Sequence, residues 1–211
     1  VIRHALYLRG GIPVSSIASV EAAYIFEYVD VSSEMYSYSH GVGAGVTVRE
    51  GKNHSTSLRY QYRHAGYGNA ALYPANSDRD GDNHLVGLTQ WASFGKSLSA
   101  SAGYAHDEDR AKQAWWDAKG DKVFVAMGVS LPYRTSLGFY GEYYQKKYDA
   151  VEPQFTVPRE DKTSTLAATA GISFTDRYGF SAGYIYVKNN SNIPELEYTR
   201  SITSATLTAR F

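Results

Sequence analysis

Apolar and polar residues alternate over long stretches of this chain. The last residues show the pattern: Ala205, Leu207, Ala209 and Phe211 would fall on one side of an extended chain, and Ser204, Thr206, Thr208 and Arg210 on the other. Successive side chains of a β-strand point to opposite faces. The alternation therefore predicts a strand with one apolar and one polar face.

The same alternation recurs throughout the sequence. From residue 19 onward it marks ten segments, which lie at 19–29, 36–48, 55–64, 84–94, 98–106, 123–131, 136–146, 165–174, 178–187 and 201–211. They run about nine to thirteen residues, the length that a tilted strand needs to cross a bilayer. The pattern predicts an all-β protein.

The connections between these segments alternate in length. Short ones at 50–54, 95–97, 132–135 and 175–177 are followed by long polar ones at 65–83, 107–121, 149–162 and 189–197. Outer-membrane barrels have short periplasmic turns and long extracellular loops. We therefore expect an antiparallel up-and-down transmembrane β-barrel in a bacterial outer membrane, formed as a single domain by residues 1–211.

A soluble β-sandwich or a lipocalin-like barrel would also have amphipathic strands. Two features favour lipid contact. The polar face is rich in glycine and carries too little bulk for an ordinary solvent surface. The apolar face carries Val, Leu, Ala and Tyr, with aromatic residues toward the segment ends, namely Phe94, Tyr104, Phe174 and Tyr186.

Composition narrows the possible functions. The net charge is zero, so nothing points to nucleic acid, and the absence of cysteine excludes disulfides and thiolate chemistry. We expect no cofactor. The 19 tyrosines suit strands with aromatic rings at a membrane interface, so membrane lipid is the first expected partner.

Residues 1–12 also alternate, with Ile2, Leu6, Leu8 and Ile12 on one side. A strand there would bring the count to eleven, whereas single-chain bacterial barrels are even-numbered. An unpaired edge in lipid leaves backbone groups unsatisfied, at a cost of several kcal/mol each. Either this segment is an extension lying along the barrel, or an upstream partner strand is missing and the chain is the C-terminal part of a longer one. The intact barrel is expected to have 10–14 strands.

The final strand, with Leu207, Ala209 and Phe211 at alternate positions, resembles the C-terminal signature of bacterial outer-membrane barrels. That resemblance implies recognition by the barrel assembly machinery. Residues 182–211 are also similar to the closing hairpin of barrels that follow tetratricopeptide repeats, as in surface lipoprotein assembly modifiers. This second resemblance implies an exported cargo and a periplasmic or N-terminal helical-repeat partner, although this sequence contains no such repeats.

Charged residues on the polar face are the main candidates for function. Arg49, Arg59, Arg63, Glu142, Lys146 and Arg210 are predicted to face the lumen, together with Glu21 and Glu27. Mixed charge fills a narrow barrel as a paired network, whereas in a wider one it lines a channel and sets selectivity. At ten strands we expect a largely plugged lumen, and at twelve to fourteen a narrow conduit. The predicted function is passage, as a pore or as the conduit of an export system, without enzymatic chemistry.

Three loop features suggest alternatives. Asp78, Asp80 and Asp82 alternate as in a calcium loop, but Gly81 lies between the second and third acid and Thr89 stands where a bidentate Glu belongs. A solvated loop tip without metal is the favoured interpretation.

His106 with Asp107 or Asp109 could serve a membrane-embedded hydrolase at the extracellular rim, although the sequence places no nucleophilic serine nearby. A cluster of rim charges is favoured. Trp115 and Trp116 could stack on a sugar or anchor a loop in lipid headgroups, with anchoring preferred. A structural or adhesive barrel that binds through its long loops is the third alternative.

Overall fold

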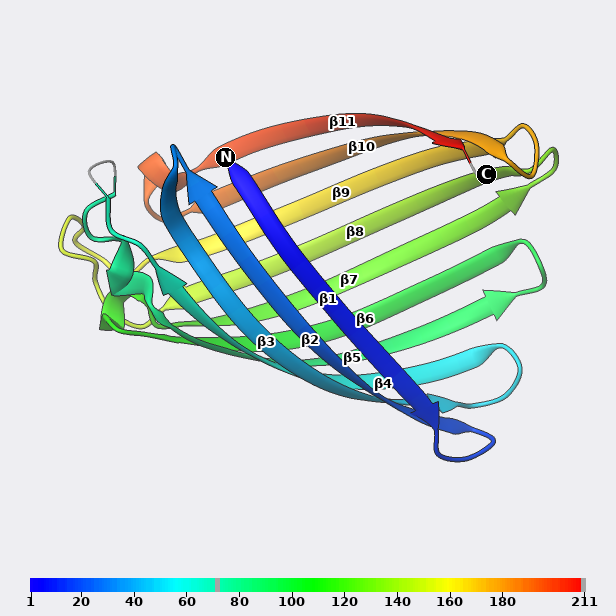
Figure 1. Cartoon of the computed structure of the whole chain (residues 1–211), viewed down its shortest axis with the longest axis horizontal. Coiled ribbons are helices and arrows are strands. Elements are labelled where there is room, and N and C mark those ends of the chain that lie inside the picture. The colour runs from blue at the N-terminus through cyan, green and yellow to red at the C-terminus, as the bar shows by residue number, and fades with distance from the viewer. Residues whose placement is uncertain (71–72, 210–211) are drawn as a thin grey trace.

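The structure, a computed structural model, describes residues 1–70 and 73–209 and contains one antiparallel sheet of eleven strands in chain order (Figure 1). The strands are β1 (Ile2–Pro13), β2 (Ala18–Val31), β3 (Glu34–Arg49), β4 (His54–Tyr67), β5 (Gly81–Phe94), β6 (Leu98–Ala111), β7 (Ala118–Leu131), β8 (Thr135–Tyr148), β9 (Glu160–Ser173), β10 (Tyr178–Ser191) and β11 (Tyr198–Ala209). Three single-turn 3-10 helices lie in the loops: η1 (Asn76–Arg79), η2 (Ala114–Trp116) and η3 (Pro194–Leu196). The predicted all-β, up-and-down architecture is confirmed.

Each strand pairs with its neighbours in the chain, and β1 and β11 are the two edges of the sheet. β1 pairs with β2 along its whole length, from Ile2 opposite Asp30 to Pro13 opposite Ser19. The idea that residues 1–12 lie along the barrel as an extension is therefore wrong. The ten later strands also do not close into a barrel by themselves, because β1 pairs with the edge of β2 that such a barrel would need.

The turns confirm the predicted alternation with one exception. Residues 14–17, 50–53, 95–97, 132–134 and 174–177 connect strands at one end of the sheet, and longer loops cluster at the other end (Figure 1). At the long-loop end, however, β2 and β3 are joined by Ser32 and Ser33 alone, at φ 54° and 65°. Two consecutive left-handed residues form the tight hairpin turn that matches strand twist.

Several strands extend further toward the long-loop end than the alternation of apolar residues indicated. β6 continues to Ala111 and β7 begins at Ala118, so the predicted loop 107–121 shortens to residues 112–117. The charged run at 106–110 is thus strand, not loop. Beyond the apolar band both faces of the sheet are polar. The alternation of apolar and polar residues, from which the strands were predicted, therefore ends before the strands do.

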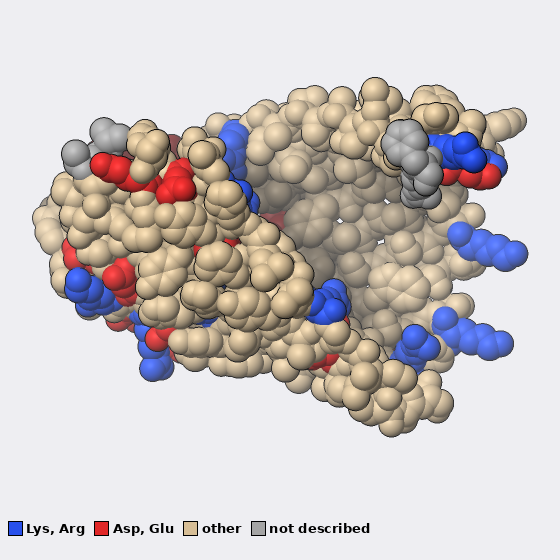
Figure 2. Space-filling view, in the orientation of Figure 1, with Lys and Arg blue, Asp and Glu red and all other residues tan. Residues whose placement is uncertain are grey.

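The sheet curls into an open trough whose inner wall is visible in the space-filling view (Figure 2). Large apolar side chains lie exposed on the convex face, for example Leu58 at 53%, Val125 at 58% and Leu166 at 61%. The buried apolar residues of the described chain are few: Ala105, Ala118, Val187 and Ile193. The described sheet has no second layer to cover its apolar face, so a soluble sandwich is excluded.

Aromatic residues border the apolar band on the convex face. Exposed aromatic side chains lie toward the long-loop end at Tyr60, Tyr104, Tyr143 and Tyr184, and toward the short turns at Phe94, Phe174 and Tyr178. This distribution matches the aromatic girdles of membrane-spanning sheets. No helix among residues 1–70 and 73–209 is long and apolar enough to cross a membrane.

Candidate functional site

The concave face carries ion pairs that connect strands two places apart. Neighbouring strands are about 4.8 Å apart, so side chains from every second strand can meet only where the sheet curves toward them. Arg59 of β4 reaches Glu21 of β2 at 2.7 Å, and Lys146 of β8 contacts Asp109 of β6. These contacts place the charged face on the concave side of the sheet, and that this side lines a lumen stays a prediction.

Near the β1 edge, Glu21 is held between two arginines. Its carboxylate accepts hydrogen bonds from Arg9 Nε at 3.0 Å and from Arg59 at 2.7 Å. Gly45 of β3 lies between Glu21 and Arg59 in the register of the sheet. A Cβ at position 45 would lie 3.1 Å from both Cγ and Oε1 of Glu21, so glycine leaves the space in which the pair meets.

A second group lies at the long-loop end of β5–β8. Asp109 contacts Lys146 and accepts a hydrogen bond from the Asn83 amide at 2.7 Å. One step along β6, the Asp107 carboxylate accepts from the Tyr144 hydroxyl at 3.0 Å. Carboxylates of β6 are thus satisfied by side chains of β5 and β8.

Aromatic rings and cations alternate above this group. The Arg79 guanidinium lies 4.6 Å from the centroid of Tyr67 and 5.0 Å from that of Trp116. The Tyr148 ring lies 5.5 Å from the Lys146 ammonium and 4.8 Å from the Arg159 guanidinium. Such cation–π contacts fix the long basic side chains in position.

Together these side chains surround a cavity of about 200 Å³ at the rim of the trough. We call it the rim cavity, and its lining includes Arg63, Tyr67, Arg79, Asn83, Asp109, Trp116, Lys146 and Tyr148. Flat rings, amide and guanidinium donors and a carboxylate can bind a polar solute through stacking and charged hydrogen bonds. The lining includes four basic residues, Arg63, Arg79, Arg110 and Lys146, and two acidic ones, Asp82 and Asp109.

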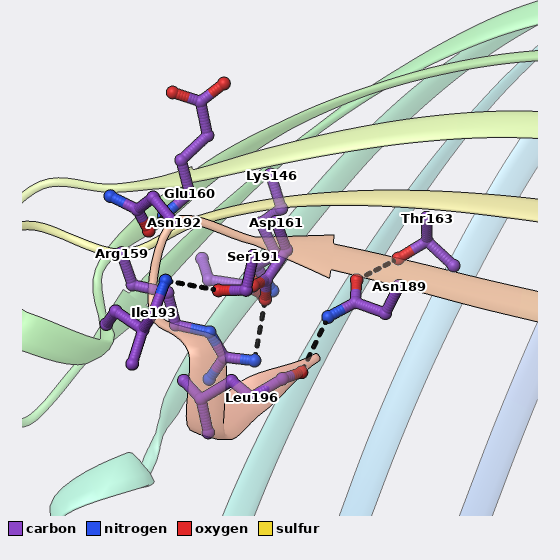
Figure 3. A network of polar contacts seen from close by, with 11 residues as sticks. Lys146, Arg159, Glu160, Asp161, Thr163, Asn189, Ser191, Asn192, Ile193 and Leu196 are labelled. Carbon is purple, nitrogen blue, oxygen red and sulfur yellow. Dashed lines mark hydrogen bonds and ion pairs between the residues drawn. The ribbon is translucent and has the colours of Figure 1, made fainter. Parts of the chain in front are cut away.

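Figure 3 shows a network of polar contacts on β9, β10 and the loop that follows β10, beside Lys146, which lies opposite Asp161 in the register of the sheet. Arg159 pairs with Asp161 at 2.6 Å, and Asp161 is only 7% exposed. Burial alone would lower the pKa of Arg159, but the hydrogen bond to Asp161 and the nearby Tyr148 outweigh it, so that its pKa is raised. The guanidinium therefore stays charged.

The same network holds the last long loop against the sheet. The Asn189 amide donates to the backbone carbonyl of Leu196 at 3.0 Å, and its oxygen accepts from the Thr163 hydroxyl at 2.7 Å (Figure 3). Ile193 beside it is 4% exposed. The loop that contains η3 is thus fixed at the rim of the trough.

The residues predicted to face the lumen do not form a single site. Arg59 pairs with Glu21, and Glu142 lies 3.5 Å from Lys122, midway along the wall. Arg49 is the last residue of β3, at the short-turn end. Only Arg63 and Lys146 come together, at the rim cavity.

Two predicted sites involve the C-terminus. Arg210 and Phe211 lie outside the described residues. Leu207 is 82% exposed on β11, and Ala209 is the last residue of that strand. Their role as an assembly signal stays a prediction.

The pairing of His106 with Asp107 or Asp109 is wrong. His106 Nδ1 lies 2.9 Å from Asp121 on the convex face, whereas both carboxylates of β6 point into the trough. Consecutive residues of a strand face opposite ways, so His106 cannot meet either of them.

The three acidic residues at 78–82 are also separated. Asp80 accepts the backbone N–H of Tyr67 at 2.6 Å, and Asp82 binds Tyr62 and His64 on the convex face. No group of three His, Asp or Glu side chains within residues 1–70 and 73–209 is arranged to hold a metal. The interpretation of this segment as a calcium loop is therefore not supported.

Trp116 packs inside the rim, with its ring 6.3 Å from that of Tyr148. The anchoring suggested for Trp115 stays a prediction.

Nothing in the sequence pointed to five residues of this region, namely Tyr67, Arg79, Tyr148, Arg159 and Asp161. Tyr148 lies two residues after Lys146, so the alternation of the strand places both on the same face and could have identified it. The position of Arg79 instead depends on the fold of the loop between β4 and β5.

Comparison with known proteins identifies the fold but not a family. No family model and no curated protein matches this sequence. Among solved structures, a mutant of the ferric enterobactin receptor of Pseudomonas aeruginosa has a TM-score of 0.53 at 10% identity, over 97% of this chain and 38% of that one. The alcaligin outer-membrane receptor of Bordetella pertussis has a TM-score of 0.47 at 11% identity, over 97% of this chain and 38% of that one. The siderophore receptor PiuA of Acinetobacter baumannii has a TM-score of 0.44 at 12% identity, over 96% of this chain and 44% of that one.

This chain therefore spans well under half the length of the receptors that it matches. At such identities the comparison concerns fold alone. The chain has the curved, antiparallel, up-and-down sheet of outer-membrane β-barrels.

Proposed function

We propose that this chain forms part of the wall of a bacterial outer-membrane barrel through which a solute passes, and that the protein is not an enzyme. The observation that carries the proposal is the distribution of apolar and charged residues between the two faces of the sheet, which is the opposite of that in a water-soluble barrel. Exposed apolar residues cover the convex side, while paired charges line the concave side. In a membrane that arrangement places lipid outside and water inside.

The unpaired edges support a larger barrel than these eleven strands. β1 and β11 each present a free row of backbone N–H and C=O groups, which lipid cannot satisfy. We infer that further strands pair with both edges in the membrane, so that residues 1–211 are one part of the barrel domain. Of the predicted total of 10–14 strands only 12–14 fit this proposal, to which the predicted recognition by the assembly machinery also belongs.

We place the long loops outside the cell and the short turns in the periplasm, as in other outer-membrane barrels. In this orientation the rim cavity is the first part of the concave wall that a solute from outside the cell reaches. Its basic residues outnumber its acidic ones by four to two, and together with its aromatic rings they favour a solute with negative charge and flat groups. An iron chelate of the kind named for the matched receptors is one candidate.

The test uses the full-length protein in its own bacterium. We expect it to fractionate with the outer membrane, and we expect purified protein in liposomes to admit small anionic solutes faster than cationic ones of equal size. Fractionation with the inner membrane would contradict the location. Liposomes that stay impermeable, together with unchanged uptake in a deletion strain, would contradict passage.

A conduit for export is the second candidate. It rests on the resemblance that the sequence of residues 182–211 suggested to the closing hairpin of surface lipoprotein assembly modifiers, which the comparisons with known proteins do not show, and it would require a helical-repeat partner and an exported cargo. Loss of a surface protein in a deletion strain, with solute uptake intact, would favour export over uptake.

A further inference from the structure

Aromatic side chains follow one another along the concave wall below the rim cavity. On β8 every fourth residue is a tyrosine on this face, so Tyr140, Tyr144 and Tyr148 lie about 13 Å apart along the strand. The hydrogen bond from Tyr144 to Asp107 of β6 shows that the face is the concave one. We call the whole set the aromatic path. From the rim toward the short turns it consists of Trp116, Tyr148, Tyr144, Tyr140, Phe124 and Trp91.

Two of these rings lie against the sheet because glycines leave room for them. The Phe124 ring covers Gly103 of β6, where a Cβ would lie 2.5 Å from the ring carbon Cε1. The Tyr144 ring covers Gly120 of β7, where a Cβ would lie 2.6 Å from Cε2. The Tyr140 ring lies beside that of Phe124, with 6.1 Å between centroids and 28° between planes. A ring that covers a glycine turns one face to the backbone and therefore turns the other to the trough.

The charged side chains between the rings are paired with one another. Glu142 lies 3.5 Å from Lys122, and Lys146 contacts Asp109. With Asp107, this stretch of wall carries three acidic and two basic residues. Such a surface offers hydrogen-bond donors and acceptors to hydroxyl groups, but its balanced charge does not hold an anion along its length.

The aromatic path continues to the short-turn end of the wall. Trp91 shares the concave face of β5 with Asn83, is 39% exposed and lies three residues before the end of the strand. A hollow of about 310 Å³ lies beside it, lined by small side chains of β6–β8 that include Ser99, Ser130 and Ser136. The rings therefore extend from the rim cavity almost to the short turns.

We propose that the aromatic path binds an acidic oligosaccharide. The apolar C–H faces of sugar rings pack on aromatic rings, and sugar hydroxyls bind charged side chains, so a chain of sugars matches rings that alternate with ion pairs. Trp116 lies inside the rim, where it can stack on the first sugar, and the excess of basic residues in the rim cavity binds the acidic groups. A compact chelate would occupy the rim cavity alone and leave the rings below it unused.

The inference rests on the proposed function, because it takes the trough as the water-filled side of the wall and names the class of solute. The test measures binding to the full-length protein in detergent by isothermal titration calorimetry. Three probes are used: hexagalacturonate, its methyl ester, which has the same sugar rings without the charges, and 2,3-dihydroxybenzoate, an aromatic anion without sugar.

The variants separate the rings from their structural role. The double variant Phe124→Leu, Tyr140→Leu removes two rings but keeps an apolar side chain over Gly103, and the two single variants replace it if it does not fold. Tyr140→Phe keeps both rings. The matched control, Tyr7→Leu, removes an exposed ring from the concave face of β1, away from the aromatic path.

We expect the wild type, Tyr140→Phe and Tyr7→Leu to bind hexagalacturonate with similar affinity, and the double variant to bind it at least about fivefold more weakly. Each single leucine variant should show part of that loss. The methyl ester should bind more weakly than the acid and lose affinity in the double variant by the same factor, because it uses the rings but not the charges of the rim cavity.

The absence of binding of either sugar to the wild type, stronger binding of 2,3-dihydroxybenzoate than of both sugars, or equal affinity of the wild type and the leucine variants would overturn the proposal. Equal affinity for the acid and its ester would overturn the role of the rim cavity in it. Because the assay requires no passage, liposomes that stay impermeable would contradict the proposed function and leave the binding site intact.

Discussion

Glu21 Oε1 and Arg59 Nη2 meet at 2.7 Å across an intervening strand, in a space that exists because residue 45 is glycine. Asp107 and Tyr144 repeat the relationship across Gly120, where a Cβ would lie 2.4 Å from the tyrosine hydroxyl and 2.5 Å from the carboxylate. Glycines on the concave face thus let polar side chains of every second strand pair.

This relationship predicts unequal costs for two glycine substitutions on β3. Gly45→Val should lower the free energy of unfolding by about 1–3 kcal/mol, because the new side chain displaces Glu21. Gly43→Val is the control, since a Cβ there meets only Tyr60 O at 3.4 Å and Ala23 Cβ at 4.0 Å. Urea unfolding of the protein in liposomes, followed by tryptophan fluorescence, measures both. Equal midpoints would show that the space at Gly45 is not needed.

Arginine substitutions test which face meets lipid. Leu58→Arg and Ala170→Arg place a charge in the bilayer near mid-strand and should each cost about 2–4 kcal/mol. Thr169→Arg lies on the concave face beside Ala170 and should cost much less, because the guanidinium enters water. Urea midpoints in liposomes give the comparison. If Thr169→Arg were the most damaging of the three, the two faces would be reversed.

The residues of the apolar band were predictable because a strand in lipid must alternate. Leu58 and Arg59 face opposite sides as the alternation required, and the pattern also made residues 1–12 a possible strand. At the long-loop end both faces are polar, so Asp107–Arg110 were predicted as loop although they continue β6. Contacts such as Arg79 with Tyr67 depend on the course of a loop, for which periodicity gives no signal.

The Asp109–Lys146 contact predicts strong coupling in a double-mutant cycle. Their side chains are 24% and 22% exposed, so each charge is partly withdrawn from water. The double variant should cost less than the sum of the costs of Asp109→Asn and Lys146→Gln, and the difference, the coupling energy, should be about 0.5–3 kcal/mol. Unfolding free energies of the four proteins measure it. Additive effects would mean that the Asn83 amide alone satisfies the carboxylate.

The last prediction separates two arginines that the sequence treated as equivalent. Arg59 shares the carboxylate of Glu21 with Arg9, whereas Arg63 forms no ion pair among the described residues and lines the rim cavity. If the barrel conducts, Arg63→Ser should therefore reduce anion preference more than Arg59→Ser. A low-dielectric wall strengthens the field of an unpaired charge, while a neutralised one contributes little. Reversal potentials of the full-length protein in planar bilayers under a salt gradient measure the difference. Equal shifts for both variants would show that Glu21 does not neutralise Arg59, and a larger shift for Arg59→Ser would mean that ions pass along β2 and β4 rather than through the rim cavity.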